Sequence, residues 1–227
     1  MKISVALFLL FSLLCGRSFG EGAKKHTFRT IFLDRPSHAP KVLYLFDGSQ
    51  SFEVDLPKMN FSKVYELPAG DLRAVLTSSA VLNLEDVPAS APTVDVPEGV
   101  TDFYLLFFSD PTNKATQVKV KLVDAGGDEL KLGETMWFNL SKCSVGGELG
   151  SIKMMIKPNS KYVMPPPIEN LGSYPARLYY QKPDSDRVFP LCQTLWRHNP
   201  KSRSIGFVYS KSADLAPLMV TFRDYRL

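Results

Sequence analysis

The sequence has little of what most catalytic and metal sites are built from. Its 227 residues include only three histidines and three cysteines. It contains no Gly-x-Ser-x-Gly nucleophile elbow and no His-Glu-x-x-His pair. The glycine-rich stretch 146–150 lacks the Lys-Ser/Thr ending of a phosphate-binding loop, so we interpret it as a hairpin turn. We therefore expect no catalytic residues, no metal site and no cofactor.

The chain also lacks a strong excess of one charge. It has 27 Lys and Arg against 23 Asp and Glu, which gives a formal net charge of +4. Nucleic-acid-binding proteins carry a pronounced basic face, so we expect no nucleic-acid partner. The charge is uneven, however, because residues 177–227 are richer in basic than in acidic side chains. This end could meet an acidic partner or polymer, or it could be a solvated basic face.

No apolar run is long enough to span a bilayer as a helix, which takes about 20 residues. The longest run, Ile3 to Leu14, follows the basic residue Lys2 and precedes the small-residue pattern of residues 18–20. This order is that of a secretory signal peptide. We expect residues 1–20 to be the signal, cleaved after Gly20, and the mature chain to have no membrane span. The predicted location is periplasmic or secreted.

Lipid attachment at Cys15 is the alternative way to read the N-terminus. A bulky residue, Leu14, directly precedes this cysteine and disfavours lipoprotein processing. Cys15 would then leave with the signal peptide. The mature chain would keep Cys143 and Cys192, which are a candidate disulfide in an oxidising compartment. Such a bridge would close a loop of about 50 residues and add about 4 kcal/mol to stability. The alternative is two buried, unpaired thiols.

Helical periodicity is absent from the chain beyond the signal, and short strand patterns take its place. Val118–Asp124 alternates apolar and polar residues, which is typical of a half-buried strand. Turn signals recur about every eight to twelve residues, as in an all-β sandwich or barrel. We expect an antiparallel β-sandwich, as one domain or as two packed immunoglobulin-like modules. The predicted strands cover residues 28–33, 42–46, 52–56, 64–67, 72–76, 103–108, 118–124, 130–132, 135–140, 151–156, 176–180, 187–195, 206–209 and 218–222.

A proline-rich stretch suggests how the chain is divided. Pro88, Pro92 and Pro97 fall within residues 86–99, and prolines at this spacing disfavour both helix and strand interiors. We expect an N-terminal β module over residues 21–100, with 86–99 as its connector, and a C-terminal β-sandwich module over residues 101–227. The continuous apolar run 103–108 predicts a strand covered on both faces. No internal repeat is recognisable in the sequence.

The most distinctive stretch for binding runs from Leu195 to Arg203. It combines a tryptophan, a histidine and three cations around Asn-Pro. Tryptophan and arginine are enriched at binding hot spots, so this segment could stack on a sugar or hold an anion. The alternative is a core tryptophan followed by a solvated basic turn. The candidate binding residues are Trp196, Arg197, His198, Lys201 and Arg203, with Tyr179 and Tyr180 as companions.

Two stretches carry a resemblance to known proteins. The segments 133–141, 149–150 and 195–203 together resemble uncharacterised exported proteins of environmental bacteria, over about the last 125 residues. The turn Leu67-Pro68-Ala69-Gly70 is similar to one common in bacterial surface β-sandwich modules. The resemblance implies an exported β-sandwich protein, and it carries no activity or site residue to transfer.

These observations favour an exported, non-catalytic protein with a binding or structural role at the cell envelope. Its partner would be an envelope protein or a polysaccharide. One alternative is a carbohydrate- or anionic-polymer-binding module that uses the stretch around Trp196. A second alternative is a divergent hydrolase, which requires several dispersed polar groups to converge in one cleft. The groups concerned are His38, Asp184, Asp186, Cys192 and His198.

Overall fold

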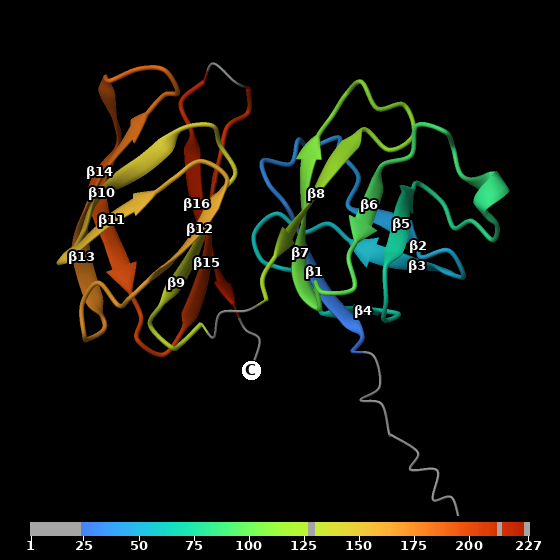
Figure 1. Ribbon diagram of the computed structural model, residues 1–227, viewed down its shortest axis with the longest axis horizontal. Helices are drawn as coiled ribbons and strands as arrows, with labels where there is room; N and C mark the ends of the chain where they lie inside the picture. The colour runs from blue at the N-terminus through green and yellow to red at the C-terminus, as the bar shows by residue number, and fades with distance from the viewer. Residues whose placement is uncertain (1–23, 127–129, 213–214, 225–227) are drawn as a thin grey trace, which may run out of the picture.

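The protein is all-β, as its sequence predicts. The computed structural model describes residues 24–126, 130–212 and 215–224, which form strands β1 to β16 and one short 3-10 helix, η1 (Leu84–Asp86). The predicted signal peptide lies outside the described residues. Two groups of strands lie side by side in Figure 1, and we call them the first and second modules. Among the described residues, no helix has the length and apolar character needed to cross a membrane.

The first module is a sandwich of two four-stranded sheets. Sheet A has the order β4-β1-β7-β8, and sheet B has the order β3-β2-β5-β6. Phe28, Leu45 and Phe103 are among the side chains that fill the space between the two sheets. The strands are β1 (His26–Phe32), β2 (Val42–Phe46), β3 (Ser51–Asp55), β4 (Tyr65–Leu67), β5 (Leu72–Thr77), β6 (Thr93–Val96), β7 (Asp102–Ser109) and β8 (Val118–Asp124).

The second module is a sandwich of the same kind. Sheet C has the order β12-β9-β15-β16, and sheet D has the order β11-β10-β13-β14. Its own core includes Trp137, Val145 and Leu178. The strands are β9 (Thr135–Asn139), β10 (Ser144–Leu149), β11 (Ile152–Ile156), β12 (Ser160–Met164), β13 (Gly172–Gln181), β14 (Val188–His198), β15 (Arg203–Tyr209) and β16 (Leu218–Asp224).

The two modules repeat one topology that the sequence does not reveal. Adding eight to each strand number of sheets A and B gives the strand orders of sheets C and D. Both modules also contain one parallel pair, β1 with β7 and β9 with β15, within otherwise antiparallel sheets. The predicted antiparallel β-sandwich is confirmed, with these two parallel pairs as exceptions. Alternation along one strand identifies its buried face but does not specify the direction of its neighbour.

The division between the modules lies further along the chain than the sequence suggested. β7 and β8 pair with β1 and with each other, so they complete the first module, and the boundary falls between β8 and β9. The proline-rich stretch 86–99 is part of this module too, because it contains β6. Val94 and Val96 of β6 are buried in the core against β5. Prolines flank this edge strand rather than interrupt it, which a sheet tolerates.

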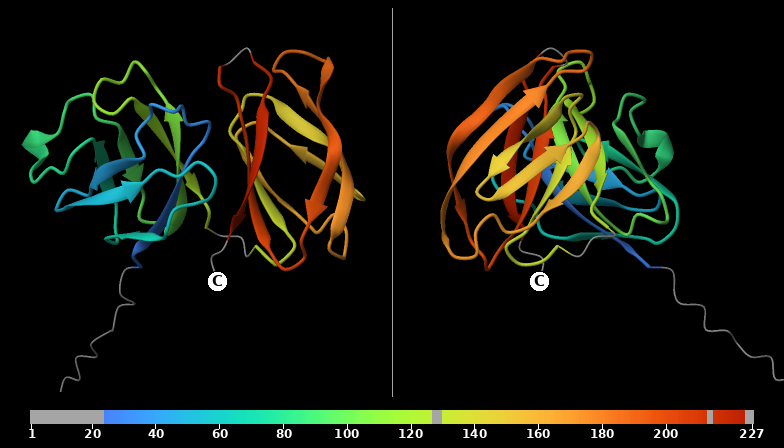
Figure 2. Two further views of the ribbon diagram at one scale, coloured as in Figure 1. Left: turned by 180° about the vertical axis from the view of Figure 1, so that it is seen from behind. Right: turned by 60° about the vertical axis from the view of Figure 1, so that its left-hand side comes forward.

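The modules are joined by a third apolar core between sheets A and C. Tyr104 and Leu106 of sheet A pack with Phe138 and Phe207 of sheet C in this core. Figures 1 and 2 show the two sheets facing one another across the centre of the molecule. The apolar run 103–108 therefore alternates between two cores, as a strand covered on both faces requires.

A buried ion pair crosses the same boundary. Arg29 of β1 donates a hydrogen bond of 2.9 Å from Nη1 to Oδ1 of Asp224, the last described residue of β16. Its Nε donates to the carbonyl oxygen of Ser62, and the guanidinium lies 5.0 Å from the ring centroid of Phe61. The two charged side chains are only 9% and 8% exposed. A buried charge is stable only when it is paired, so Asp224 ties the end of the second module to the first.

The two cysteines of the predicted mature chain are free thiols, so the candidate disulfide is not formed and the alternative of unpaired thiols holds. Cys143 directly precedes β10, whereas Cys192 lies on β14, and β13 separates these strands. Two strand spacings amount to about 9–10 Å, which exceeds the about 7 Å that a disulfide spans between Cα atoms. Burial raises the pKa of the Cys143 thiol.

Removal of the Asp224 carboxylate should destabilise the protein strongly. Asp224→Ala leaves the Arg29 guanidinium buried without its partner, and we expect the free energy of unfolding to fall by about 3 kcal/mol. The control is Lys25→Ala, which removes a pair with Glu66 whose side chains are 69% and 62% exposed. That control should cost less than about 1 kcal/mol. Urea denaturation measures both, and equal losses would contradict the role given to Asp224.

Candidate functional site

The inner face of sheet C becomes polar toward one end of the second module. Thr135, Ser204 and Arg223 form a row of cross-strand partners there, on β9, β15 and β16. They alternate with residues that face sheet A, such as Ile205, so the row faces sheet D. The first inward pair of the first module is instead Phe28 with Phe103.

The aromatic pair in the first module fills the space that the polar row leaves open in the second. The rings of Phe28 and Phe103 stack with centroids 5.4 Å apart, and Tyr65 stacks on Phe28 from the other side. Side chains of threonine and serine cannot fill the same volume. The two modules therefore differ in packing and in polarity at their first inward-facing pair, which is Phe28–Phe103 in the first module and Thr135–Ser204 in the second.

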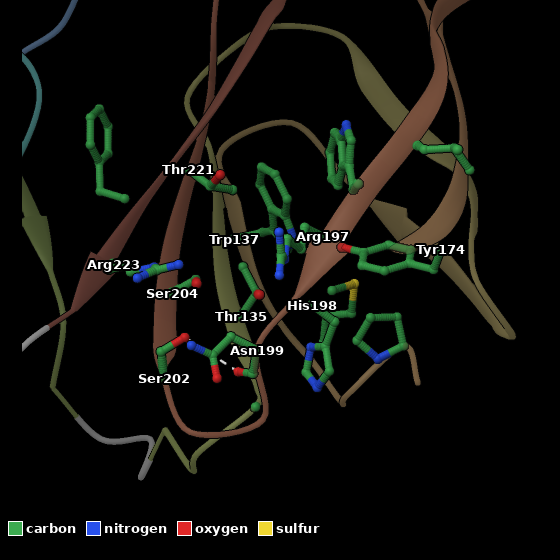
Figure 3. Close-up of a pocket in the computed structure, with 16 residues that line it drawn as sticks. Thr135, Trp137, Tyr174, Arg197, His198, Asn199, Ser202, Ser204, Thr221 and Arg223 are labelled. Atoms are coloured by element: carbon green, nitrogen blue, oxygen red, sulfur yellow. Dashed lines mark hydrogen bonds between the residues drawn. The ribbon is translucent and has the colours of Figure 1, made fainter. Parts of the chain in front are cut away.

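The second module is open at the edge next to this row. In the first module the edge strands β6 and β8 contact each other and close the sandwich. Among the described residues, no comparable set of contacts joins β14 to β16. A cavity of about 410 Å³ lies between these two strands, which is within the range of small-ligand sites. Figure 3 shows Ser202, Ser204 and Arg223 on one side of this hollow and Tyr174 on the other.

A stacked pair of tryptophans forms one wall of the cavity. Trp137 is fully buried, and the ring of Trp196 stacks on it with centroids 6.0 Å apart and an interplanar angle of 25°. The other neighbour of the Trp137 ring is Gly206, its cross-strand partner. A Cβ added at Gly206 would lie 2.2 Å from Cε3 of Trp137, so the indole occupies the space of the missing side chain.

Two buried nitrogen atoms at the cavity have no partner. Among the residues that the structure describes, Nε1 of Trp137 and Nε2 of His198 make no hydrogen bond. Both residues line the cavity, and His198 is only 6% exposed. Leaving a buried polar group unpaired costs about 1–3 kcal/mol. These two atoms are therefore unsatisfied polar groups within the wall of the cavity.

Two arginines give the cavity a positive charge. Arg197 and Arg223 line it from the edge strands β14 and β16, and no aspartate or glutamate is among the described residues that line it. Within the described parts of the chain, neither guanidinium forms a hydrogen bond or an ion pair. Arginine is suited to carboxylate and phosphate groups because its planar fork donates two parallel hydrogen bonds. The cavity is thus complementary to an anion.

The tyrosine and the histidine of the cavity, Tyr174 and His198, are neutral near pH 7. Burial raises the pKa of Tyr174 to about 12, so its hydroxyl keeps its proton. Burial lowers the pKa of His198 from its usual value of 6.5, because the imidazolium form loses solvation. Tyr174 can therefore donate a hydrogen bond, and His198 can donate or accept one according to its tautomer.

The structure brings together only part of the predicted binding set. Trp196, Arg197 and His198 line one cavity, whereas Lys201 lies in the exposed β14–β15 turn and is not among the lining residues. Arg203 lies outside the lining as well, and it contacts the Leu130 carbonyl oxygen and Asp224.

The two companion tyrosines lie away from the cavity. Tyr179 is exposed on the outer face of sheet D, near Arg177. Tyr180 is buried in the core of the second module and stacks on Phe189 with centroids 5.3 Å apart. Tyr179 and Tyr180 are successive residues of β13, so their side chains point to opposite faces of sheet D.

The residues that line the cavity but were not predicted from the sequence include Thr135, Trp137, Ser204 and Arg223. Three of them are polar residues at inward-facing positions of strands that are otherwise apolar on that side. This break in alternation was visible in the sequence as a signal. The sequence does not say which alternate residues of each strand face the interior, because a shift by one residue exchanges the two faces. The polar positions could therefore be assigned to a site only from the structure.

The residues that a hydrolase would need are dispersed. His198 lines the cavity, but His38 lies in an exposed loop of the first module. Asp184 and Asp186 lie in the turn between β13 and β14, at the end of that hairpin opposite His198. In the described ranges, no three His, Cys, Asp or Glu side chains are grouped so that they could hold a metal ion.

Comparison with known proteins does not assign the chain to a family. No protein-family model matches the sequence, and no curated protein matches it.

Substitution of Gly206 should disturb the tryptophan wall. Gly206→Ala places a methyl group in the plane of contact with Trp137, and overpacking of this kind costs about 1–3 kcal/mol. The control is Gly99→Ala, where an added Cβ has no atom within 4 Å. Thermal unfolding of the two variants should show a lower midpoint only for Gly206→Ala. Equal midpoints would mean that the indole can move away at little cost.

His198 should make the stability of the protein depend on pH. Its folded pKa is lowered, so the unfolded chain binds more protons below about pH 6.5, and the free energy of unfolding should fall as the pH drops through that range. His198→Gln should remove part of this slope between about pH 7.5 and 5. Denaturant titrations at several pH values test this. A slope unchanged by the substitution would contradict it.

Proposed function

We propose that this chain is an exported, non-catalytic binding protein that holds an anionic partner in the cavity of its second module. The observation that carries the proposal is the combination of unpaired groups around this cavity. Two buried nitrogens lack partners, and two arginines lack counter-ions among the described residues. The buried nitrogens are costly while they remain unpaired, and the exposed arginines offer charge-assisted hydrogen bonds to an anion that enters the cavity.

The shape of the cavity supports a ligand with both oxygen atoms and an apolar surface. Trp196 is half-buried and offers part of its ring to the opening, while the hydroxyls of Thr135, Ser204 and Thr221 line the opposite wall. Indole and guanidinium groups can contact flat surfaces, and hydroxyls can donate or accept hydrogen bonds. A carboxylate-bearing chain, whether a polysaccharide or a polypeptide, satisfies these requirements.

The cellular part of the proposal rests on the N-terminal sequence. A signal peptide over residues 1–20 would export the chain to the periplasm or beyond the cell, where the partner would be an envelope protein or polysaccharide. The positive charge of residues 177–227 supports an acidic partner as well, because the C-terminal strands that border the cavity lie in this range. Long-range attraction of this kind raises association rates.

Binding can be followed through the two tryptophans. The chain contains only Trp137 and Trp196, and both line the cavity, so tryptophan fluorescence reports on this site alone. We expect polygalacturonate or polyglutamate to change the emission at low salt, and neutral dextran to leave it unchanged. The double variant Arg197→Gln/Arg223→Gln should bind these polyanions about tenfold more weakly or worse.

A matched variant separates the cavity from general electrostatics. Arg177→Gln/Lys201→Gln removes two exposed positive charges of the same module that lie outside the cavity lining. It should bind the polyanions nearly as well as the unsubstituted chain. Equal weakening in both double variants would show non-specific attraction and would overturn the proposal. Trp196→Ala is a less decisive test, because Trp196 also packs on Trp137.

A further inference from the structure

The edge strand β14 is protected against strand pairing along its first half only. Pro190 lies in this half, and the ladder with β13 contains an irregularity in which Leu191 has no partner. Proline and β-bulges are the features with which proteins block an exposed sheet edge. The second half, from Gln193 to His198, carries neither, and it is this half that borders the cavity.

The open half of β14 presents backbone groups to the cavity opening. The N–H of Gly150 donates to the carbonyl oxygen of Pro175 at 2.8 Å, so Pro175 directs its backbone oxygen toward β10 and away from β14. Its neighbours Tyr174 and Ala176 therefore pair with β14, opposite Trp196 and Thr194. The residues between and beside these positions, Gln193, Leu195 and Arg197, turn their N–H and C=O groups outward.

The first module shows what this edge looks like when it is closed. There the strand equivalent to β14 is β6, which has only four residues and contacts β8. β14 has eleven residues and ends beside an open cavity. A long edge strand with unpaired backbone groups is a template for another strand.

We propose that the partner is a polypeptide whose extended acidic segment pairs with residues 193–198 of β14 and becomes a fifth strand of sheet D. This inference rests on the proposed function and specifies its ligand. Every second side chain of the added strand would enter the cavity, where Arg223 and the two unpaired nitrogens lie. A carboxylate on an inward-facing side chain would enter beside the exposed Arg223 guanidinium, which suits it as a counter-ion.

Polypeptide fits this edge better than polysaccharide does. The outward groups of Gln193, Leu195 and Arg197 form an alternating series of donors and acceptors at the spacing of a β-strand. An extended peptide repeats the complementary series, whereas a sugar chain has no such regular alternation. The arginines then select acidic side chains among the peptides that can pair.

The test uses the full mature chain and a synthetic peptide in which valine alternates with glutamate. Leu195→Pro removes one outward N–H but leaves the ladder with β13, because residue 195 does not donate to β13. We expect this variant to bind the peptide at least about tenfold more weakly. The control Leu195→Ala removes the same exposed side chain but keeps the N–H, and it should bind as the unsubstituted chain does. The corresponding valine–lysine peptide should not bind measurably.

The outcomes distinguish this inference from the proposed function. If Leu195→Pro binds the peptide normally while Arg197→Gln/Arg223→Gln does not, strand pairing is overturned and anion binding stands. If oligogalacturonate binds more tightly than the peptide and ignores Leu195→Pro, the ligand is a polysaccharide. If Arg197→Gln/Arg223→Gln binds every anion normally, both ideas fall. Concentration-dependent dimers that Leu195→Pro abolishes would replace the partner by a second copy of this chain.

A second probe keeps the test valid if Leu195→Pro fails to fold. Two versions of the valine–glutamate peptide carry N-methyl groups on alternate residues, each version blocking one edge of the strand. The version whose blocked edge faces β14 should lose affinity, and the other should retain it. Equal binding of both versions would overturn strand pairing without any substitution in the protein.

Discussion

The contact between sheets A and C is the constraint on which the rest of the structure depends. Tyr104, Leu106, Phe138 and Phe207 fill this boundary, so both sheets have an apolar side that faces the partner module. The other face of sheet C looks toward sheet D and carries a row of polar side chains. Thr135, Ser204 and Arg223 form this row, and all three line the cavity.

The ion pair at the same boundary also shapes the electrostatics of the cavity. Asp224 follows Arg223 directly on β16, but its carboxylate turns to the opposite face and pairs with Arg29 of the first module. Arg203 lies near it as well, at 4.0 Å. The nearest acid in the sequence is therefore held by other cations, and the Arg223 guanidinium faces the cavity without a counter-ion among the described residues. Two adjacent residues thus serve different roles: Asp224 joins the modules, and Arg223 contributes to the positive charge of the cavity.

Repetition of one topology allows the two modules to be compared position by position. The first module places Phe28 and Phe103 at the level where the second places Thr135 and Ser204. The first module also closes its edge with a short β6, where the second has the long strand β14. The aromatic contacts of the first module stabilise the fold through burial and stacking. In the second module the same level contributes less to stability and leaves room for a partner.

The sequence by itself determined the local pattern of this protein. Alternation in stretches such as Val118–Asp124 identified strands, the double-sided run 103–108 identified a buried one, and the segment around Trp196 marked part of the site. Periodicity is set by residues that are neighbours along the chain, so it can be read from the chain. Only the tertiary structure decided that β1 pairs with β7, that Cys143 and Cys192 stay apart, and that Arg223 meets His198 across a cavity. Those relations join residues far apart in sequence, and they depend on strand order and on which face each strand buries. A shift of one residue in the register of a strand would exchange its buried and exposed faces, although the alternating pattern along the strand would stay the same.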